Sequence, residues 1–189
     1  MHIDADFFRD EIRDGFYVPT IIKQAWANAL QVLSAIDEIC TRHNIRYFAE
    51  WGTMLGAIRH SGIVPWDDDV DIGMLRQDYE KFRSVCDSEL PDGYVVHDYE
   101  RKENHWLFLC RIVSSSHINF DEKYLEDHYN FPWLSSVDIF IIDNVYDDPD
   151  IEKERDDKIM HLLAVADSLI ESSLLSASIR ISLENIEKE

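Results

Sequence analysis

Aspartates in segments that otherwise resemble buried strands are the most chemically informative feature of the sequence. One run is Trp66-Asp67-Asp68-Asp69-Val70-Asp71-Ile72-Gly73, and a later apolar run, Val137-Asp138-Ile139-Phe140, contains a further aspartate. A buried carboxylate is destabilising unless something neutralises its charge, and Mg²⁺ is a hard cation that takes oxygen ligands. The arrangement indicates metal-assisted phosphoryl transfer, with one or two Mg²⁺ ions and Mn²⁺ as a substitute.

The spacing of these aspartates predicts how they would meet. Asp69 and Asp71 are two residues apart, so in a strand both side chains would leave the same face, about 7 Å apart. If the strand that contains Asp138 lies beside this one, the three carboxylates converge. The alternative is an acidic surface loop, which would be favoured for an isolated Asp-rich run. The later aspartate and an upstream Gly-Thr pair favour the functional interpretation.

That upstream pair, Gly52-Thr53, lies where a predicted strand passes into a short helix. A glycine lets a phosphate approach the backbone, and the first amides of a helix attract anions. The hydroxyl of Thr53 could bind a phosphate oxygen, although the pair alone could equally be a helix cap. Arg59, further along the same helix, is suited to a two-pronged phosphate contact, and a salt bridge to a nearby acid is the equal alternative.

The hydrophobic pattern predicts an α/β or α+β domain, a mixed sheet with helices on it. Helices are expected over residues 4–15, 19–44, 52–60 and 77–90, and from 149 onward, where the last helix would pack on the domain. Strands are expected at 45–51, 69–74, 94–98, 106–113 and 136–142, with 114–134 irregular. We divide the chain into an N-terminal helical segment (1–44), a catalytic core (45–145) and a C-terminal helical segment (146–189).

Composition limits the partners and the compartment. Asp and Glu number 38 against 18 Lys and Arg, a formal net charge of −20. Such an acidic surface repels phosphate backbones, so nucleic acid is excluded as a partner. The N-terminus lacks the pattern of a signal peptide, and no apolar run is long enough to span a bilayer. With three widely separated cysteines, we expect a cytoplasmic protein, and peripheral membrane association through a lipid-linked acceptor is the alternative.

The stretch from Ile45 to Phe82 closely resembles the signature of the LicD family of phosphocholine (phospho-alcohol) transferases. The matching residues are Gly52-Thr53, Leu55-Gly56, Arg59-His60, Gly62, Ile63, Pro65-Trp66, Asp67 to Asp69, Asp71, Arg76, Asp78-Tyr79 and Phe82. Val137 to Phe140 with Asp143 resembles the family's later Asp segment. The fukutin-related sugar-modifying proteins share this core. The family belongs to the nucleotidyltransferase superfamily, which pairs a Gly-Ser-like turn with an Asp-x-Asp strand and a third acid on a later strand.

The resemblance implies a nucleotidyltransferase-like fold and a CDP-alcohol donor, most typically CDP-choline. The phospho-alcohol would pass to a hydroxyl of a cell-surface glycan, lipopolysaccharide or teichoic acid precursor, lipid-linked or not, with release of CMP. The implied metal ligands are Asp69, Asp71, Asp138 and Asp67, and Asp138 is also the expected acceptor of the hydroxyl proton. The donor would be held by Gly52, Thr53, Arg59 and Trp66, with Arg59 countering charge on the leaving nucleotide.

A choline donor would add one requirement, an aromatic cage for its quaternary ammonium. The candidates are Trp51, Trp66, Trp106, Tyr129 and Trp133, each of which could instead be an ordinary core or loop-anchoring aromatic. We rank Trp66 first because it is fixed between Pro65 and the aspartates.

Two other functions stay open at this point. One is a nucleotidyltransferase that acts on a small molecule or sugar, and the other is a non-catalytic nucleotide-binding module. Family members usually continue well beyond 189 residues, with a C-terminal region that would shape the acceptor site. The alternatives for this chain, with its C-terminal segment 146–189, are a truncated form, an incomplete gene product or a short member of the family.

Overall fold

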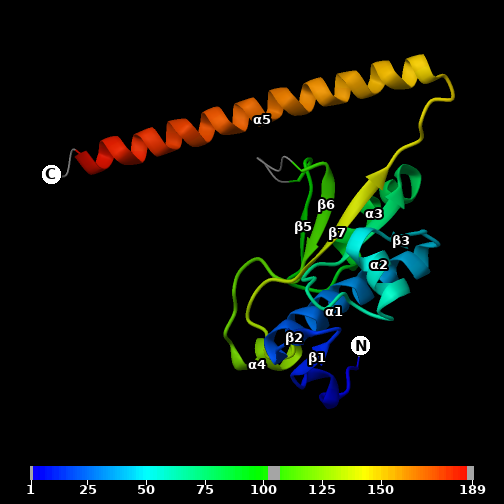
Figure 1. Ribbon diagram of the computed structural model, residues 1–189, viewed down its shortest axis with the longest axis vertical. Helices are drawn as coiled ribbons and strands as arrows, with labels where there is room; N and C mark the ends of the chain where they lie inside the picture. Colours follow the sequence, from blue (N-terminus) through cyan, green and yellow to red (C-terminus); the bar gives the residue numbers. More distant parts are fainter. Residues whose placement is uncertain (1, 102–106, 187–189) are drawn as a thin grey trace. The chain divides into compact units, whose positions relative to one another are not determined.

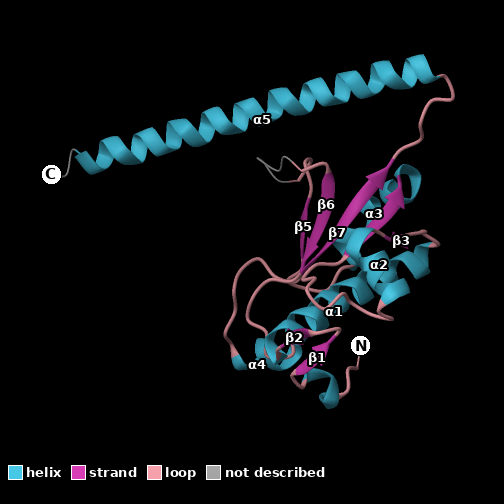
Figure 2. Ribbon diagram, in the orientation of Figure 1, coloured by secondary structure: helices cyan, strands magenta, loops and turns pink. Residues whose placement is uncertain are grey.

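A computed structural model describes residues 2–101 and 107–186 of the chain, with side chains described through residue 169. Two compact units are present, Met1–Asp143 and Asn144–Glu189. The first holds a five-stranded sheet with helices, and the second is dominated by one long helix (Figures 1 and 2). The predicted mixed sheet with flanking helices is thus confirmed.

The sheet has the strand order β3-β4-β7-β6-β5. These strands are β3 (Phe48–Ala49), β4 (Asp71–Leu75), β7 (Ser136–Ile142), β6 (Leu109–Val113) and β5 (Val95–His97). The central pair β4–β7 is parallel, and the other neighbours are antiparallel. A parallel centre places the equivalent ends of β4 and β7 together, which matters because both strands carry an aspartate near their start.

Two helices cover one face of this sheet. They are α1 (Thr20–His43) and α3 (Arg76–Glu89), and both contribute to the main hydrophobic core. Alternate strand residues point into this core, among them Ile72 and Ile139, which are each 1% or less exposed. Because side chains alternate across a strand, Asp71 and Asp138 leave the opposite face.

The central strands differ in their limits from the prediction. β4 begins at Asp71 rather than at residue 69, so Asp69 precedes the strand instead of sharing it with Asp71. The preceding residues form a turn in which Asp67 donates its amide to Val64 and Trp26 Nε1 donates to the carbonyl of Asp67 at 2.7 Å. These bonds hold the chain in a turn immediately before the aspartates that lead into β4.

Other expected strands are shorter too. β3 contains two residues where seven were predicted, and β6 begins at Leu109. Trp106, expected to start that strand, lies outside the described residues. The region expected to be irregular, 114–134, contains one short helix, α4 (Glu122–Asp127).

The helix predicted over residues 4–15 is wrong. A 3₁₀ helix (Ala5–Phe8) is followed by a hairpin of β1 (Glu11–Arg13) and β2 (Phe16–Val18). Asp14 and Gly15 form its two-residue turn with φ of 52° and 80°. Positive φ at both central positions is the type I′ geometry that Asp-Gly favours, and this local preference overrides the weak helical pattern.

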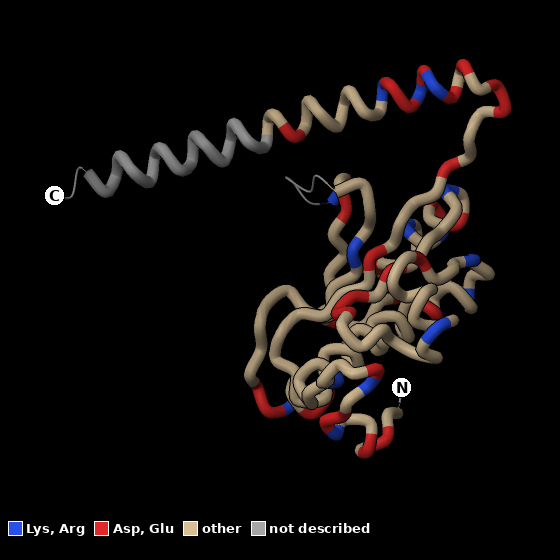
Figure 3. The backbone as a smooth tube through the Cα atoms, viewed as in Figure 1, with Lys and Arg blue, Asp and Glu red and all other residues tan. Residues whose placement is uncertain are grey.

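The second unit contains α5 (Pro149–Ile186), which confirms the helix expected from residue 149. Its first turns carry acidic and basic residues together, and the pairs Lys153–Asp157 and Glu154–Lys158 follow the i,i+4 spacing of helix-stabilising ion pairs (Figure 3). Across the described part of the chain, no helix has both the length and the apolar character that crossing a bilayer requires.

Candidate active site

Asp71 and Asp138 occupy directly paired positions on the parallel strands β4 and β7. Both are 9% exposed. The backbone amide of Asp138 donates to the carbonyl of Val70 at 3.0 Å, which fixes the register at this end of the pair. The predicted convergence of the two strand aspartates is therefore seen in the structure, on the sheet face opposite α1 and α3.

Arg111 is the cation at this site, and our sequence reasoning missed it. It lies in register with Asp138 on β6 and donates from Nε to Oδ1 at 2.5 Å and from Nη2 to Oδ2 at 2.6 Å. This two-pronged geometry is that of a charge-assisted hydrogen-bonded pair, and it raises the pKa of Arg111. The signal was present in the sequence: Leu109-Cys110-Arg111-Ile112-Val113 is a charge within an apolar strand, the same pattern that singled out Asp138.

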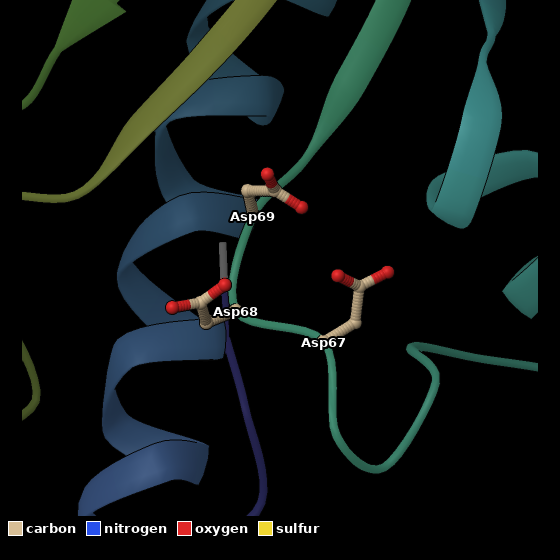
Figure 4. Close-up of side chains that lie close together, drawn as sticks. All are labelled: Asp67, Asp68 and Asp69. Carbon is tan, nitrogen blue, oxygen red and sulfur yellow. The ribbon is translucent and has the colours of Figure 1, made fainter.

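The loop before β4 supplies a second group of carboxylates. Asp67, Asp68 and Asp69 each bring an oxygen within 4.8 Å of the others. Asp67 and Asp69 lie on one side of the loop ribbon and Asp68 on the other (Figure 4). Partial burial, together with a hydrogen bond to Asp67, raises the pKa of Asp69.

Uncompensated negative charge extends to the strand aspartates. Burial raises the pKa of Asp71 to about 6, and repulsion from Asp69, Asp138 and Asp67 adds to this effect, while Arg111 opposes it. Burial alone disfavours a charged carboxylate, and the added repulsion from three neighbouring aspartates shows that negative charges are crowded here. Such a group attracts a cation.

The short helix α2 (Trp51–Arg59) is attached to the site at its N-terminal end. The amide of Glu50 donates to the carbonyl of Asp71 at 3.0 Å, and the amide of Asp71 donates to Oγ1 of Thr53 at 2.9 Å. Thr53, predicted to bind a phosphate, thus also fixes α2 to β4. Its own O–H remains a donor, so the predicted phosphate contact stays a prediction.

Gly52 is required because the side chain of Asp67 approaches its backbone closely, whereas the sequence predicted the approach of a phosphate. A β-carbon at this position would lie 2.1 Å from Oδ2 of Asp67. The carboxylate of Asp67 therefore lies against the start of α2, the end of a helix that favours negative charge. Any phosphate contact of Gly52 is a prediction that the structure leaves open.

Arg59 and Trp66 form a group of their own. Arg59 ends α2, about 12 Å along the helix axis from Trp51 at 1.5 Å per residue. Its guanidinium lies 5.8 Å from the ring centre of Trp66, and its Nε donates to Nδ1 of His60. Trp66 is adjacent in sequence to Asp67, but neither Arg59 nor Trp66 joins Asp71 and Asp138 through a described contact. Their predicted roles in donor binding stay predictions.

The other aromatic candidates are dispersed. Trp51 is 66% exposed, and its ring centre lies 6.1 Å from that of Phe140. Tyr129 stacks on Phe8, and Trp133 contacts Phe131 in the irregular region. Trp106 is not among the described residues. Only Trp51 of the described candidates therefore adjoins a strand that carries a site aspartate.

A mostly apolar cavity of about 500 Å³ adjoins the carboxylate loop. Asp67 and Asp69 border it, as do Gly52 and Thr53. Its other lining residues are Phe7, Arg13, Trp26, Leu30, Leu33, Ala57, Ser61, Gly62, Ile63 and Val70.

The donor set fits the predicted magnesium ions. Asp67, Asp69 and Asp71 offer hard oxygen ligands, and repulsion from neighbouring carboxylates adds to burial in raising the pKa of Asp69 and Asp71. Asp138 differs because Arg111 already binds both its oxygens. It could reach an ion only with its remaining lone pairs or after Arg111 moves.

Comparisons with known proteins agree with this geometry. Residues 44–154, more than half of the chain, match the family described as LicD/FKTN/FKRP, nucleotidyltransferase domain. Lipopolysaccharide cholinephosphotransferase LicD of Haemophilus influenzae is 32% identical over 123 residues, covering 65% of this chain and 44% of that protein. An uncharacterised protein of Rickettsia prowazekii is 30% identical over 130 residues, covering 58% of this chain and 48% of that protein.

Human ribitol 5-phosphate transferase FKRP is 33% identical over a shorter stretch of 81 residues, which cover 41% of this chain and 16% of that protein. The chain spans less than half the length of these relatives. The family match covers Gly52-Thr53, the aspartate loop, β4, β6 and β7, which together form the site described above. The chain belongs to the LicD/FKTN/FKRP family of nucleotidyltransferase-domain proteins.

Proposed function

We propose that this protein transfers a phospho-alcohol, phosphocholine before others, from a CDP-activated donor to a hydroxyl of a cell-surface glycan or its lipid-linked precursor. The observation that carries the proposal is the in-register pair Asp71–Asp138 beside the carboxylate loop. The relative from Haemophilus influenzae is named as a lipopolysaccharide cholinephosphotransferase and the human relative as a ribitol 5-phosphate transferase. Both names describe phospho-alcohol transfer, which supports this reaction class.

The roles of the carboxylates follow from their surroundings. Asp67, Asp69 and Asp71 would hold Mg²⁺, or Mn²⁺ in its place, because they offer hard oxygen ligands within one group of mutually repelling carboxylates. When bound, these ions would neutralise the donor's diphosphate and favour departure of CMP. Asp138 would accept the proton of the attacking hydroxyl. Arg111 orients that carboxylate through two hydrogen bonds, which would fix its position relative to the attacking hydroxyl.

Electrostatics of the whole chain are consistent with an activated small donor rather than with a polymer of phosphates. The formal net charge is −20, so an anionic donor depends on local cations. Arg111 is fixed beside the site, and the predicted metal ions would add further positive charge.

The test is release of CMP from a panel of CDP-choline, CDP-glycerol and CDP-ribitol, with Mg²⁺ and with EDTA. We expect Mg²⁺-dependent release that depends on the alcohol and disappears in Asp69→Ala and Asp71→Ala. Asp127→Ala, which removes an exposed acid from α4, is the matched control and should retain full release. Wild-type rates in either site variant would contradict the assignment.

The product distinguishes the competing functions. A nucleotidylated acceptor with no CMP release would indicate a nucleotidyltransferase instead. A non-catalytic module would bind a CDP-alcohol, seen as a rise in melting temperature with Mg²⁺, without turning it over in the presence of a lipopolysaccharide or teichoic acid acceptor. Absence of both binding and release would overturn the proposal.

A further inference from the structure

Trp51 has an unusual backbone conformation for a large, exposed side chain. Its φ is 42°, in the left-handed region, which is unfavourable for a residue other than glycine. The side chain is 66% exposed, so burial of the indole does not offset this strain. Strained, exposed residues occur preferentially at functional sites.

The strain is maintained by the site itself. Trp51 lies between Glu50, whose amide binds the carbonyl of Asp71, and the Gly52-Thr53 pair, whose hydroxyl binds the amide of Asp71. Both ends of this short segment are thus fixed to the same strand residue. The indole is thereby directed to the sheet face that carries Asp71, where it meets Phe140 edge-on at 6.1 Å with an interplanar angle of 61°.

Phe140 connects the indole with the reaction centre. It follows Asp138 by two residues on β7, so both side chains leave the same face. Its partner in register on β4 is Gly73, and a β-carbon at Gly73 would lie 3.0 Å from Oε1 of Glu50. The rings of Trp51 and Phe140 and the carboxylate of Glu50 therefore lie near the Gly73–Phe140 position, two residues along the strands from Asp71 and Asp138.

Other aromatic faces near the carboxylates already hold a cation of the protein. Arg13 lies over Trp26, Lys23 over Phe7 and Arg59 over Trp66. Within the described residues, no Lys or Arg lies over the ring of Trp51. This distinguishes Trp51 from Trp66, the residue we ranked first from the sequence.

We propose that Trp51, with Phe140 and Glu50, forms the subsite for the alcohol of the donor and selects a quaternary ammonium group. This inference rests on the proposed phospho-alcohol transfer and names its substrate class. An aromatic face attracts a cation through the ring quadrupole, and a nearby carboxylate adds charge complementarity. A neutral polyol such as glycerol or ribitol gains neither interaction, so the subsite makes the enzyme a choline rather than a polyol transferase.

The experiment compares the dissociation constants of CDP-choline and CDP-glycerol, measured by calorimetry with Mg²⁺, in substitutions of Trp51 that share the same backbone strain. Trp51→Leu removes the π face and keeps apolar bulk, whereas Trp51→Phe keeps a π face. We expect Trp51→Leu to weaken CDP-choline about 3- to 30-fold, the range for a cation–π contact, and to leave CDP-glycerol within about twofold. Trp51→Phe should restore most of the preference.

Two further variants complete the test. Trp51→Gly relieves the left-handed strain, so its melting temperature should be no lower than that of the wild type while its choline preference is lost. Phe120→Ala removes a 69% exposed aromatic elsewhere and should change neither donor. An equal loss for both donors in Trp51→Leu, or a wild type that prefers CDP-glycerol, overturns the inference and leaves phospho-alcohol transfer standing. No binding of either donor overturns the proposed function as well.

Discussion

Arg111 and Asp138 face each other in register on β6 and β7 and are joined by two hydrogen bonds of 2.5 and 2.6 Å. The pair lies beside a concentration of acid, because Asp138 is also the register partner of Asp71 on its other side. One guanidinium thus stands against two strand aspartates and the adjoining carboxylate loop. From this imbalance we expect the site to bind cations and its stability to depend on pH.

Arg111→Leu should therefore destabilise the metal-free protein and make it more dependent on Mg²⁺. Removal of one partner leaves Asp138 buried and unpaired, so we expect a loss of about 1–3 kcal/mol in unfolding free energy in EDTA. Mg²⁺ should restore more stability to the variant than to the wild type, measured by urea denaturation with and without the ion. The control is Arg76→Leu, which breaks a more exposed pair with Asp143 and should cost less than about 1 kcal/mol independently of Mg²⁺. An identical Mg²⁺ response in both variants would contradict the idea.

Asp71 should make the metal-free protein less stable as the pH rises. Burial raises its pKa to about 6 in the folded state, so between about pH 4 and 6 the folded state binds more protons than the unfolded state. Stability from this group is thus lost as pH rises through 6. Asp71→Asn cannot ionise and should gain about 1–2 kcal/mol at pH 8, less than the full shift implies because solvent screens the site.

The measurement is the gain in unfolding free energy of Asp71→Asn over the wild type as a function of pH. It should shrink as the pH falls through 6 and be small near pH 4.5, in urea denaturation with EDTA. Asp10→Asn is a control of opposite sign, because hydrogen bonds from Tyr17 and Thr20 lower the pKa of Asp10. That variant should lose stability at neutral pH, and its loss should disappear in acid as the Asp10 carboxyl of the wild type is protonated. A gain for Asp71→Asn that is constant with pH would mean that charge is not its cause.

The sequence predicts the parts of this fold that depend on patterns along one element. The mixed sheet, the helices α1 and α3, and the meeting of Asp71 with Asp138 follow from hydrophobic periodicity and from aspartates within apolar strands. The N-terminal hairpin was missed because a weak helical pattern was preferred to the Asp14-Gly15 turn signal. Arg111 was missed although its pattern, a charge within an apolar strand, equals that of Asp138.

Other features depend on contacts between distant segments, which no local pattern contains. The turn that contains Asp67 is held by Trp26, 41 residues earlier, whose Nε1 donates to the carbonyl of Asp67. Glycine is needed at position 52 because the side chain of Asp67 lies too close for a β-carbon, not because the backbone of Gly52 adopts a special conformation. The exposure and backbone strain of Trp51 depend on the bonds that join its neighbours Glu50 and Thr53 to Asp71 on β4, and the sequence does not contain these contacts.

Thr53→Val should destabilise the protein even without a donor. Valine has nearly the same shape, but it removes the oxygen that accepts the amide of Asp71 at 2.9 Å. The unpaired amide should cost about 1–3 kcal/mol of unfolding free energy, whereas Thr53→Ser should cost less than about 1 kcal/mol because it keeps the acceptor. Urea denaturation in EDTA measures both. If Thr53→Val has wild-type stability, the bond to Asp71 is not what makes a hydroxyl necessary here.

Gly52→Ala should affect metal binding far more than folding. The new methyl would lie 2.1 Å from Oδ2 of Asp67, and the end of that side chain is free to rotate, so the strain is relieved by displacing the carboxylate. We expect at most about 1–2 kcal/mol of lost stability, since overpacking is offset by the better helix propensity of alanine. Affinity for Mg²⁺, measured by calorimetry, should fall about tenfold or more because a ligand has moved.

The matched control for this substitution is Gly62→Ala. Its β-carbon would approach only Nη1 of Arg13, at 4.0 Å, so the space there is open. This variant should keep both stability and Mg²⁺ affinity. If Gly52→Ala binds Mg²⁺ as tightly as Gly62→Ala does, then Asp67 is not a ligand, and the ion would have to be held by Asp69 and Asp71 alone.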